Sequence, residues 1–425
     1  MDDLLIIGAG LAGLSAAYTA AKNGLKVRII TKGLATSHWN AGTVDVLGYN
    51  GTGADNDAPR QPVARPLDTV TTFSQEHPSH PYALLTPASI ANALESFKMW
   101  AQEAGLPYVG ASTAGDNWLL PSPIGAARPT FLAPRAQTAG DLLRQEPFVI
   151  VGFRGLRDFF PELIASNLTS QGHAARAVFL PLELLTDKGD RNTIQLAQAL
   201  DDSLRTARLG RELKGIVKAG ERIGLPAILG MDNHTRIIED LRAQTGAPVF
   251  EIPTLPPSVP GFRLHKALTR QLGALGVRIE LNQEAIGFQA VDGRVAWVET
   301  ATSSRPLRHR AKTFLLATGG ILGAGFNTDH NGRVWEVVFD LPLTVPQRRS
   351  QWFHPQFMDP SGHPVFQGGV TVNQKFQPLG SDGQPVYSNL WAAGGLLADA
   401  DPINERSLEG IAVATGVSAA QQIRI

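Results

Sequence analysis

Three glycines near the start of the chain have the spacing of a phosphate-binding turn. Residues 8–13 read Gly-Ala-Gly-Leu-Ala-Gly, which places Gly8, Gly10 and Gly13 in a G-x-G-x-x-G pattern between an apolar strand-like stretch and an alanine-rich helical stretch. In such a unit the first glycine permits a tight turn, the second lets a diphosphate approach the backbone, and the third allows close helix–strand packing. The pattern predicts a dinucleotide site at the helix N-terminus, where the helix dipole favours negative charge. The alternative is a glycine turn with a structural role only.

The residues after the second predicted strand depart from the usual dinucleotide pattern. An aspartate or glutamate normally binds the ribose hydroxyls at this position, but here the strand over residues 26–30 ends at Thr31 and Lys32. The threonine hydroxyl can exchange a hydrogen bond with the cofactor, and the lysine can approach a phosphate, so both are candidate cofactor ligands. The missing acid disfavours ordinary NAD binding and leaves a flavin dinucleotide as the better candidate.

Two more strand-to-glycine turns occur late in the chain. Residues 314–317 are apolar and lead into Thr318 and Gly319, and residues 389–393 lead into Gly394 and Gly395. A helix of small residues over 410–422 follows, and its N-terminus could face the anionic edge of a flavin ring. We expect the three turns to converge on one flavin. The glycine turn favours the diphosphate of FAD, whereas FMN stays open because the missing acid leaves the adenosine end unexplained.

Composition excludes several classes of protein. The chain has 425 residues, 38 basic and 38 acidic side chains, 43% hydrophobic residues and no cysteine. Charge neutrality argues against a nucleic-acid-binding protein, and the absence of cysteine excludes disulfides, thiolate metal sites and cysteine-held iron–sulfur clusters within the chain. No H-E-x-x-H or paired-carboxylate pattern predicts a metal site. Residues 4–21 are long and apolar enough to be weighed as a membrane span, but their acidic flank and spaced glycines favour a buried strand and helix.

The order of predicted elements indicates an α/β fold with a divided cofactor domain. Apolar strand patterns alternate with helical patterns, and a hairpin is expected over residues 286–300 about Asp292-Gly293. The proline-rich stretch 254–261 reads as a stiff connector and a lobe boundary, and the stretch 50–66 reads as a surface loop. We therefore predict a Rossmann-like, doubly wound parallel sheet for FAD, formed by residues 1–90 and 261–425, with an inserted α/β capping lobe formed by residues 91–260.

Several blocks of the sequence resemble those of a known family. They are Thr-Lys-Gly at 31–33, His38, Gly-Thr-Val-Asp at 42–45, Gly-Phe-Arg-Gly-Leu-Arg-Asp-Phe at 152–159, Thr-Leu-Pro-Pro-Ser-Val-Pro-Gly-Phe-Arg-Leu at 254–264, Asn-Leu-Trp-Ala-Ala-Gly at 389–394, Asp-Pro-Ile at 401–403 and Ala-Ala-Gln-Gln-Ile at 419–423. In this order they resemble the B subunit of anaerobic glycerol-3-phosphate dehydrogenase over nearly the whole chain. One departure is Asn-Glu-Arg-Ser-Leu-Glu at 404–409, where a glycine-rich run is expected.

The resemblance implies a flavoprotein of the fumarate-reductase-like superfamily in a membrane-associated complex. Such a complex passes electrons from glycerol 3-phosphate towards quinone. The implied partners are a catalytic flavoprotein sister subunit and an iron–sulfur subunit that anchors the complex to the membrane. The implied location is cytoplasmic, peripheral on the inner face of the plasma membrane through these partners. A flavin can accept a hydride, but a chain without cysteine has no cluster to carry electrons farther.

Candidate catalytic residues are fewer and less specific. His38 lies on the loop that runs past the flavin ring in the wider superfamily, and it is open to covalent attachment, a noncovalent flavin-side role or a purely structural one. Gly42, followed by Thr43, would bring backbone amides near the ring. Arg263 with His265, or Arg154 with Arg157, would bind an anionic phosphate substrate, although arginines also commonly cover helix surfaces. His354 is either a proton-transfer group or an interface residue.

Three functions fit these observations. The chain is a working dehydrogenase subunit with substrate held near Arg263, or a non-catalytic flavin subunit that relays electrons and supports a catalytic sister chain, or a stand-alone flavoprotein like fumarate reductase or aspartate oxidase that acts on a small carboxylate. Reduction of the flavin by glycerol 3-phosphate distinguishes the first from the second, and reduction by a dicarboxylate identifies the third.

Overall fold

The computed structural model describes residues 1–50, 61–112, 114–187, 191–357 and 359–424. Its residues form two compact units. Unit 1 comprises Met1–Thr36, Asp45–Trp100 and Leu268–Ile425, and unit 2 comprises Ser37–Val44 and Ala101–Ala267. Most of the loop predicted over 50–66 lies outside the described residues, and its last residue, Pro66, begins a helix.

Unit 1 is built on a five-stranded parallel sheet with the strand order β11-β2-β1-β15-β18. The strands are β1 (Asp2–Ile7), β2 (Val27–Ile30), β11 (Arg278–Glu280), β15 (Ala311–Leu316) and β18 (Leu390–Ala392). Leu4 of β1 lies opposite Val27 on one side and Thr313 on the other. The central strands are apolar on both faces because helices and loops cover a parallel sheet from both sides. The predicted α/β class with a Rossmann-like parallel sheet is confirmed.

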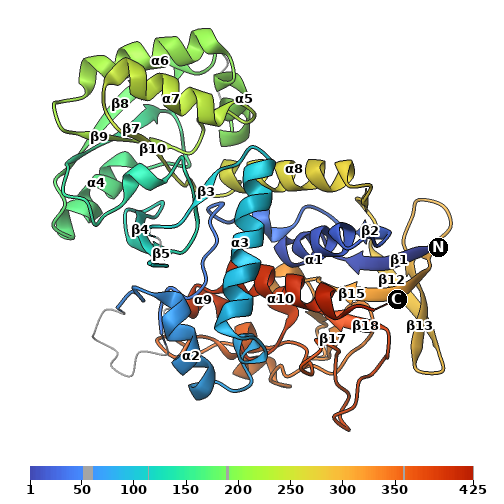
Figure 1. The fold of residues 1–425 in the computed structure, drawn as a ribbon. Helices are drawn as coiled ribbons and strands as arrows, with labels where there is room; N and C mark the ends of the chain where they lie inside the picture. Colours follow the sequence, from blue (N-terminus) through green and yellow to red (C-terminus); the bar gives the residue numbers. More distant parts are fainter. Residues whose placement is uncertain (51–60, 113, 188–190, 358, 425) are drawn as a thin grey trace. The chain divides into compact units, whose positions relative to one another are not determined.

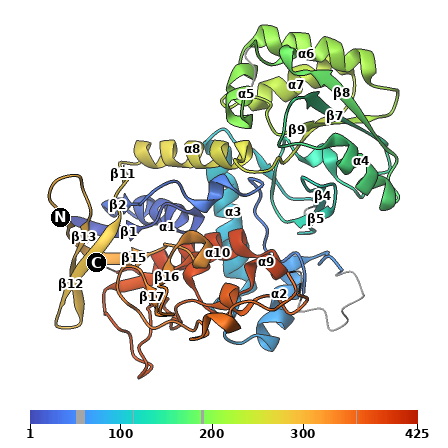
Figure 2. The same ribbon diagram turned by 180° about the vertical axis from the view of Figure 1, so that it is seen from behind.

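Two helices of small residues pack closely in unit 1. Helix α1 (Leu11–Lys22) and helix α10 (Leu408–Gln422) lie side by side in Figures 1 and 2. A Cβ added at Gly416 of α10 would lie 2.4 Å from the carbonyl oxygen of Ala12 in α1. A larger residue would therefore separate the helices, which explains why α10 is rich in alanine and glycine.

The remaining elements of unit 1 surround this sheet. The predicted hairpin is confirmed, since Asp292 and Gly293 both have positive φ, at 50° and 70°, as a type I′ turn requires. Helix α3 (Pro87–Glu103) begins in unit 1 and ends in unit 2. The other elements of unit 1 are α2 (Pro66–Glu76), β12 (Ala285–Val291), β13 (Arg294–Thr300), β14 (Leu307–His309), β16 (Phe326–Thr328), β17 (Val334–Glu336) and α9 (Pro402–Glu405). No helix among the described residues has both the length and the apolar character needed to cross a membrane.

Unit 2 contains a second parallel sheet with the order β10-β9-β7-β8. Its core includes Phe148, Leu225 and Phe250, all at most 1% exposed. Helix α8 (Val259–Ala274) begins in unit 2 and ends in unit 1. The other elements of unit 2 are β3 (Tyr108–Val109), β4 (Trp118–Pro121), β5 (Ala127–Thr130), β6 (Ala133–Pro134), β7 (Phe148–Arg154), α4 (Pro161–Ser170), β8 (Ala175–Pro181), α5 (Thr193–Leu200), α6 (Ser203–Ile216), β9 (Arg222–Pro226), α7 (His234–Thr245) and β10 (Val249–Ile252).

The unit boundaries differ in three places from the lobe limits expected at 90 and 260, the first being that unit 1 runs to Trp100, within α3. Helix α8 begins at Val259, inside the stretch expected to be a connector, and the units divide within α8 at Ala267 and Leu268. The short segment Ser37–Val44 belongs with unit 2, although it was expected in the cofactor domain. A proline in the first turn is compatible with a helix because its missing N–H is unpaired there in any case, so Pro260 lies in the first turn of α8.

A buried carboxyl in unit 1 predicts a pH-dependent stability. Glu336, 1% exposed, accepts hydrogen bonds from the amides of Val338 and Phe339, and burial raises its pKa to about 7. Because the folded form binds the proton more tightly than the unfolded form, its stabilisation is complete below about pH 4.5 and is lost as the pH rises through 7. As the pH rises from 4.5 to above 7, the free energy of unfolding of the native chain should fall by about 3 kcal/mol more than that of Glu336→Gln. Measuring the free energy of unfolding of both proteins against pH tests this. An equal pH slope in both proteins would contradict this assignment.

Candidate cofactor site

The three glycine turns lie together at one edge of the unit 1 sheet. Because β1, β15 and β18 are parallel neighbours or next neighbours, their carboxyl ends meet at the same edge. The backbone continues the ladder beyond the strands, with Ala317 N donating to Ile7 O at 2.8 Å and Ala393 N donating to Leu316 O at 3.0 Å. The convergence that the sequence predicts is therefore present in the fold.

The first turn requires glycine at Gly8. Its φ is +113°, and an added Cβ would lie 2.2 Å from the carbonyl oxygen of Ala317. Gly10 is the N-cap of α1 and has no side-chain cap, so the first amides of the helix have no side-chain acceptor. An added Cβ at Gly10 would meet only Ala35, at 4.0 Å. The turn thus presents free amides beside open space, which is the arrangement that an anionic diphosphate needs.

The second and third turns approach each other closely. A Cβ added at Gly320 would lie 2.6 Å from the carbonyl oxygen of Gly395, and one added at Gly394 would lie 2.6 Å from Cβ of Ala12 in α1. Thr318 has a buried hydroxyl with no partner among the described residues, next to Gly319 in the second turn. A buried hydroxyl without a hydrogen-bond partner, beside the turns, is a candidate group to bind a cofactor.

Thr31 and Lys32 are already engaged at the end of β2. The Thr31 hydroxyl donates to the carbonyl oxygen of Gly33 at 3.0 Å and retains acceptor capacity. Lys32 is exposed, and its ammonium group pairs with Glu284 at 2.6 Å. Lys32 as a phosphate ligand is therefore not favoured by this geometry, whereas Thr31 stays a candidate.

The segment 404–409, which stands where a glycine-rich run was expected, forms a buried polar network ahead of α10. The Glu405 carboxylate accepts from His80 Nε2 at 3.1 Å, from the Ser407 hydroxyl at 2.7 Å and from the Asp401 amide at 2.8 Å. Arg406 has φ +52° and pairs with Asp45 at 3.0 Å. The turn before α10 is thus held by side chains.

His80 fixes this network and is absent from the sequence-based site residues. Its Nδ1 accepts from the Tyr82 amide at 3.0 Å, so its Nε2 carries the proton given to Glu405. Burial opposes ionisation of Glu405, but the hydrogen bonds from His80, from the Asp401 amide and from Ser407 lower its pKa overall. No spacing signal could have found this pair, because 325 residues separate its members.

In unit 2 the structure brings His38 and His265 together. Their ring centroids lie 4.6 Å apart, and His38 packs edge-on against Phe262 at 4.1 Å. The exposed fractions of His38 and His265 are 4% and 8%. Helix α8 supplies Phe262 and His265, and the amide of Ser258 just before it donates to the His38 carbonyl. The pair remains a candidate for proton transfer.

Gly42 and Thr43 are held by other residues of unit 2. The Gly42 amide donates to the Asn40 side chain at 2.9 Å, and an added Cβ would lie 2.5 Å from Cβ of Pro260. The Thr43 hydroxyl accepts from Arg128 at 2.7 Å and is buried. The Gly42 amide, expected near a flavin ring, is thus already paired.

Of the remaining candidate substrate residues, Arg263 is paired inside unit 2 and the others lie at the surface. Arg263 is buried, and its guanidinium donates to both carboxylate oxygens of Glu251, at 2.6 and 2.8 Å, and to the Gly230 carbonyl. A guanidinium neutralised in this way is a poor phosphate ligand. Arg154 and Arg157 are exposed. His354 is also exposed, on a loop where its amide donates to Nδ1 of His363. No group of three metal-ligating side chains occurs in the part of the chain that the structure describes.

Comparison with known proteins identifies the family and its cofactor. A family model described as an FAD binding domain matches residues 3–411. The B subunit of anaerobic glycerol-3-phosphate dehydrogenase from Yersinia pestis bv. Antiqua (strain Antiqua) is 30% identical over 431 residues, covering 99% of this chain and 97% of that protein. The chain belongs to this family. A probable B subunit of the same enzyme from Halobacterium salinarum (strain ATCC 29341 / DSM 671 / R1) is 31% identical, covering 98% of this chain and 96% of the relative.

Among solved structures, the open conformation of a flavocytochrome c3 fumarate reductase is similar with a TM-score of 0.45 and 10% identity, covering 99% of this chain and 78% of that one. The FAD-binding domain confirms FAD as the predicted cofactor of this member of the B-subunit family.

The residues present fit FAD. The uncapped N-terminus of α1 suits the diphosphate, and Gly10 leaves the space that a Cβ would occupy. The buried Thr318 hydroxyl, unpartnered among the described residues, supplies a further polar contact. When bound, FAD accepts a hydride and releases electrons singly or in pairs. The groups of this chain that would hold and orient it are the backbone amides of the turns, whose glycines keep side chains away.

Proposed function

We propose that this chain is the FAD-bearing B subunit of an anaerobic glycerol-3-phosphate dehydrogenase complex, and that its flavin takes electrons from glycerol 3-phosphate for transfer towards quinone. The proposal rests chiefly on the convergence of the three glycine turns around the uncapped N-terminus of α1. It is supported by full-length relatives with that name. The family and its flavin make the protein an oxidoreductase; oxidation of the substrate by this subunit is the part that requires a test.

The partners follow from the chemistry of electron transfer. The chain has no cysteine, so it holds no cysteine-bound iron–sulfur cluster through which electrons could continue. We propose an iron–sulfur subunit as the onward carrier and as the membrane anchor, with a second flavoprotein as sister subunit. The present chain would then sit at the cytoplasmic face of the membrane through these partners.

A second function is favoured by the state of Arg263. Because Glu251 neutralises this arginine, the residue expected to hold the substrate phosphate is engaged elsewhere. In this second proposal the sister subunit oxidises the substrate and the present FAD relays its electrons.

Anaerobic reduction of the FAD-loaded chain distinguishes the two. If the subunit oxidises substrate, glycerol 3-phosphate bleaches the flavin absorbance and supports reduction of an artificial acceptor, whereas glycerol does neither. If it is a relay, glycerol 3-phosphate fails alone but bleaches the flavin after the sister subunit is added. Bleaching by a dicarboxylate instead would contradict both and identify a fumarate-reductase-like activity.

A further inference from the structure

The start of α10 lies beside the third glycine turn of unit 1. A Cβ added at Gly395 would lie 2.9 Å from Cδ1 of Leu408, the first residue of α10. The Gly394 amide donates to the Thr415 hydroxyl of the same helix at 2.9 Å. In the neighbouring second turn, the Thr318 hydroxyl is buried and has no partner among the described residues. The N-terminus of α10 therefore borders the turns that fit FAD.

The N-cap residue of α10, Ser407, makes no side-chain cap to the helix amides. It is buried, and its hydroxyl donates instead to Glu405 at 2.7 Å. This end of the helix therefore keeps partial positive charge. A neutral flavin ring that accepts a hydride gains a negative charge, and a helix N-terminus beside the ring stabilises that charge. The start of α10 would thus favour reduced over oxidised FAD.

The turn that leads into α10 is held at Glu405, the last residue of α9. Its carboxylate accepts from the Ser407 hydroxyl, and its carbonyl oxygen accepts from the amides of Gly48 at 2.8 Å and Tyr49 at 3.1 Å. Arg406, the next residue, has φ +52°, a left-handed conformation that costs energy for a residue other than glycine. The turn therefore depends on the contacts that hold Glu405 in place.

His80 holds the Glu405 carboxylate from outside this turn. Its ring is 1% exposed, lies edge-on to the Phe73 ring at 5.0 Å, and accepts from the Tyr82 amide through Nδ1 at 3.0 Å. These contacts fix the ring so that Nε2 donates to Glu405 at 3.1 Å. In this tautomer the imidazole is neutral. Among the described residues, no amide of α10 donates to the Glu405 carboxylate, which is directed to partners outside the helix.

We propose that His80 is a positioning residue for the bound flavin: through Glu405 it fixes the start of α10 at the third glycine turn and so raises the reduction potential of FAD. Without His80 the turn loses one of its anchors, and the Glu405 charge can turn towards the α10 amides. Either change makes the negative charge of the reduced ring less stable. This role requires FAD at the glycine turns, but it does not depend on which subunit oxidises glycerol 3-phosphate.

The reduction potential of the FAD-loaded chain, measured with redox dyes and without substrate, tests this role. In His80→Asn the side-chain oxygen can still accept from the Tyr82 amide, but no donor reaches Glu405. We expect reduced FAD to lose about tenfold in stability relative to oxidised FAD, which lowers the potential of a two-electron couple by about 30 mV. In His80→Gln the longer side chain carries an N–H donor to Glu405, so the potential should stay near that of the native chain.

A second variant breaks the next contact. Ser407→Ala removes the hydroxyl that joins Glu405 to the start of α10 but takes away no helix cap, so the chain should stay folded. The potential should fall in the same direction, by about threefold or more in the ratio of reduced to oxidised FAD stability. A substitution that merely loosens the structure weakens both forms of FAD equally and leaves the potential unchanged.

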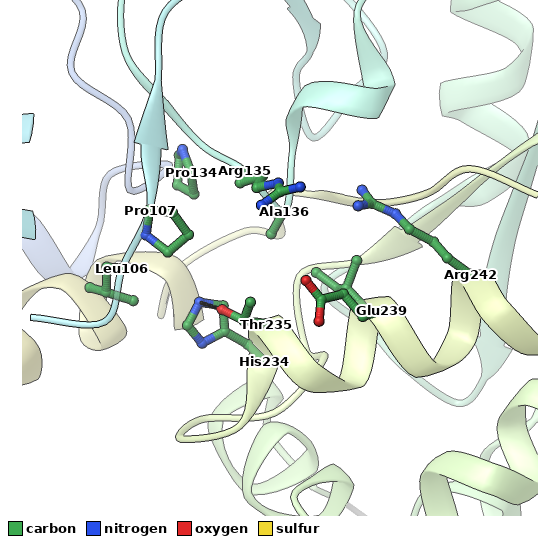
Figure 3. A pocket seen from close by; sticks show the side chains of 10 residues that line it. Leu106, Pro107, Pro134, Arg135, Ala136, His234, Thr235, Glu239 and Arg242 are labelled. Atoms are coloured by element: carbon green, nitrogen blue, oxygen red, sulfur yellow. Dashed lines mark hydrogen bonds between the residues drawn. The ribbon is translucent and has the colours of Figure 1, made fainter. Parts of the chain in front are cut away.

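His234→Ala is the matched control. Figure 3 shows His234 on α7 of unit 2, where it lines a pocket with room for roughly one water molecule. It is buried like His80, and burial lowers its pKa to about 4, so the substitution removes a neutral imidazole and no charge at pH 7. Because it takes no part in the turn at Glu405, the potential should stay unchanged. Circular dichroism shows whether each variant is folded.

Three results would each overturn the role of His80. The first is an unchanged potential in a folded, FAD-loaded His80→Asn or Ser407→Ala protein. The second is an equal fall in His80→Asn and His80→Gln, because the donor to Glu405 would then not matter. The third is a fall of the same size in His234→Ala. None of these measurements uses glycerol 3-phosphate, so they hold even if the sister subunit oxidises it.

Discussion

Replacing Gly10 by alanine is expected to lower the affinity for FAD about a hundredfold while leaving the chain folded. Gly10 has φ −75° and ψ 178°, which any residue adopts, and an added Cβ has no neighbour closer than Ala35 at 4.0 Å. The methyl group instead projects where a diphosphate must approach the first amides of α1. Loss of two charge-assisted hydrogen bonds, at about 1.5 kcal/mol or more each, corresponds to this factor. Quenching of flavin fluorescence measures the dissociation constant.

The control for Gly10→Ala is Gly215→Ala. Gly215 lies in α6 and has no heavy atom within 4 Å of an added Cβ, so the substitution should leave FAD binding unchanged and raise helix stability by up to about 1 kcal/mol. Circular dichroism and thermal unfolding of the flavin-free proteins show whether Gly10→Ala is folded. Unchanged FAD affinity in a folded Gly10→Ala protein would refute the placement of the diphosphate at this turn.

Replacing Arg263 by alanine should destabilise unit 2 by about 3–5 kcal/mol. The change leaves the Glu251 carboxylate buried at 1% side-chain exposure, without the guanidinium that neutralises it. Breaking a buried ion pair from one side carries this cost because the remaining charge cannot be solvated. The free energy of unfolding by urea measures the effect. A substrate-binding arginine would instead lower turnover with little change in stability.

Lys266→Ala is the matched control for Arg263→Ala. Lys266 lies on the same helix and pairs with Asp232 at 2.6 Å, but both side chains are more than half exposed, so this loss should cost less than about 1 kcal/mol. A double substitution, Arg263→Met with Glu251→Met, removes both charges and should recover much of the stability. If the single Arg263→Ala change were as mild as Lys266→Ala, the structural role assigned to the pair would be wrong.

Sequence patterns predicted the sheet and its turns because these depend on local chemistry. A run such as residues 4–7 followed by Gly8 leaves few alternatives to a buried strand and a tight turn, and the observed strand Asp2–Ile7 contains it. Parallel strands then bring their carboxyl ends to one edge, so three separate turns had to meet. The sequence pattern predicts helices near 193–208 and 211–219, and it misplaces the break between α5 and α6. That break depends on one side chain, because Asp202 accepts from the Leu204 amide and starts α6 at Ser203.

Long-range polar pairing was not predictable in the same way. Nothing local to Arg263 on helix α8 indicates that Glu251, on strand β10, will neutralise it. His80 and Glu405 likewise pair across most of the chain. A charged residue in a sequence therefore offers two readings, ligand or internal partner, and only the fold decides between them.

The chain order of the unit 1 sheet has a consequence for biosynthesis. Strand β1 is made first, but its neighbour β15 begins at Ala311 and the sheet edge strand β18 at Leu390. An emerging polypeptide can complete the contiguous stretch Ala101–Ala267 while β1, whose neighbour β2 is already made, still lacks its second neighbour β15. The nucleotide cradle is consequently completed only late in synthesis, and a nascent chain that stalls before β18 has no complete place for its flavin.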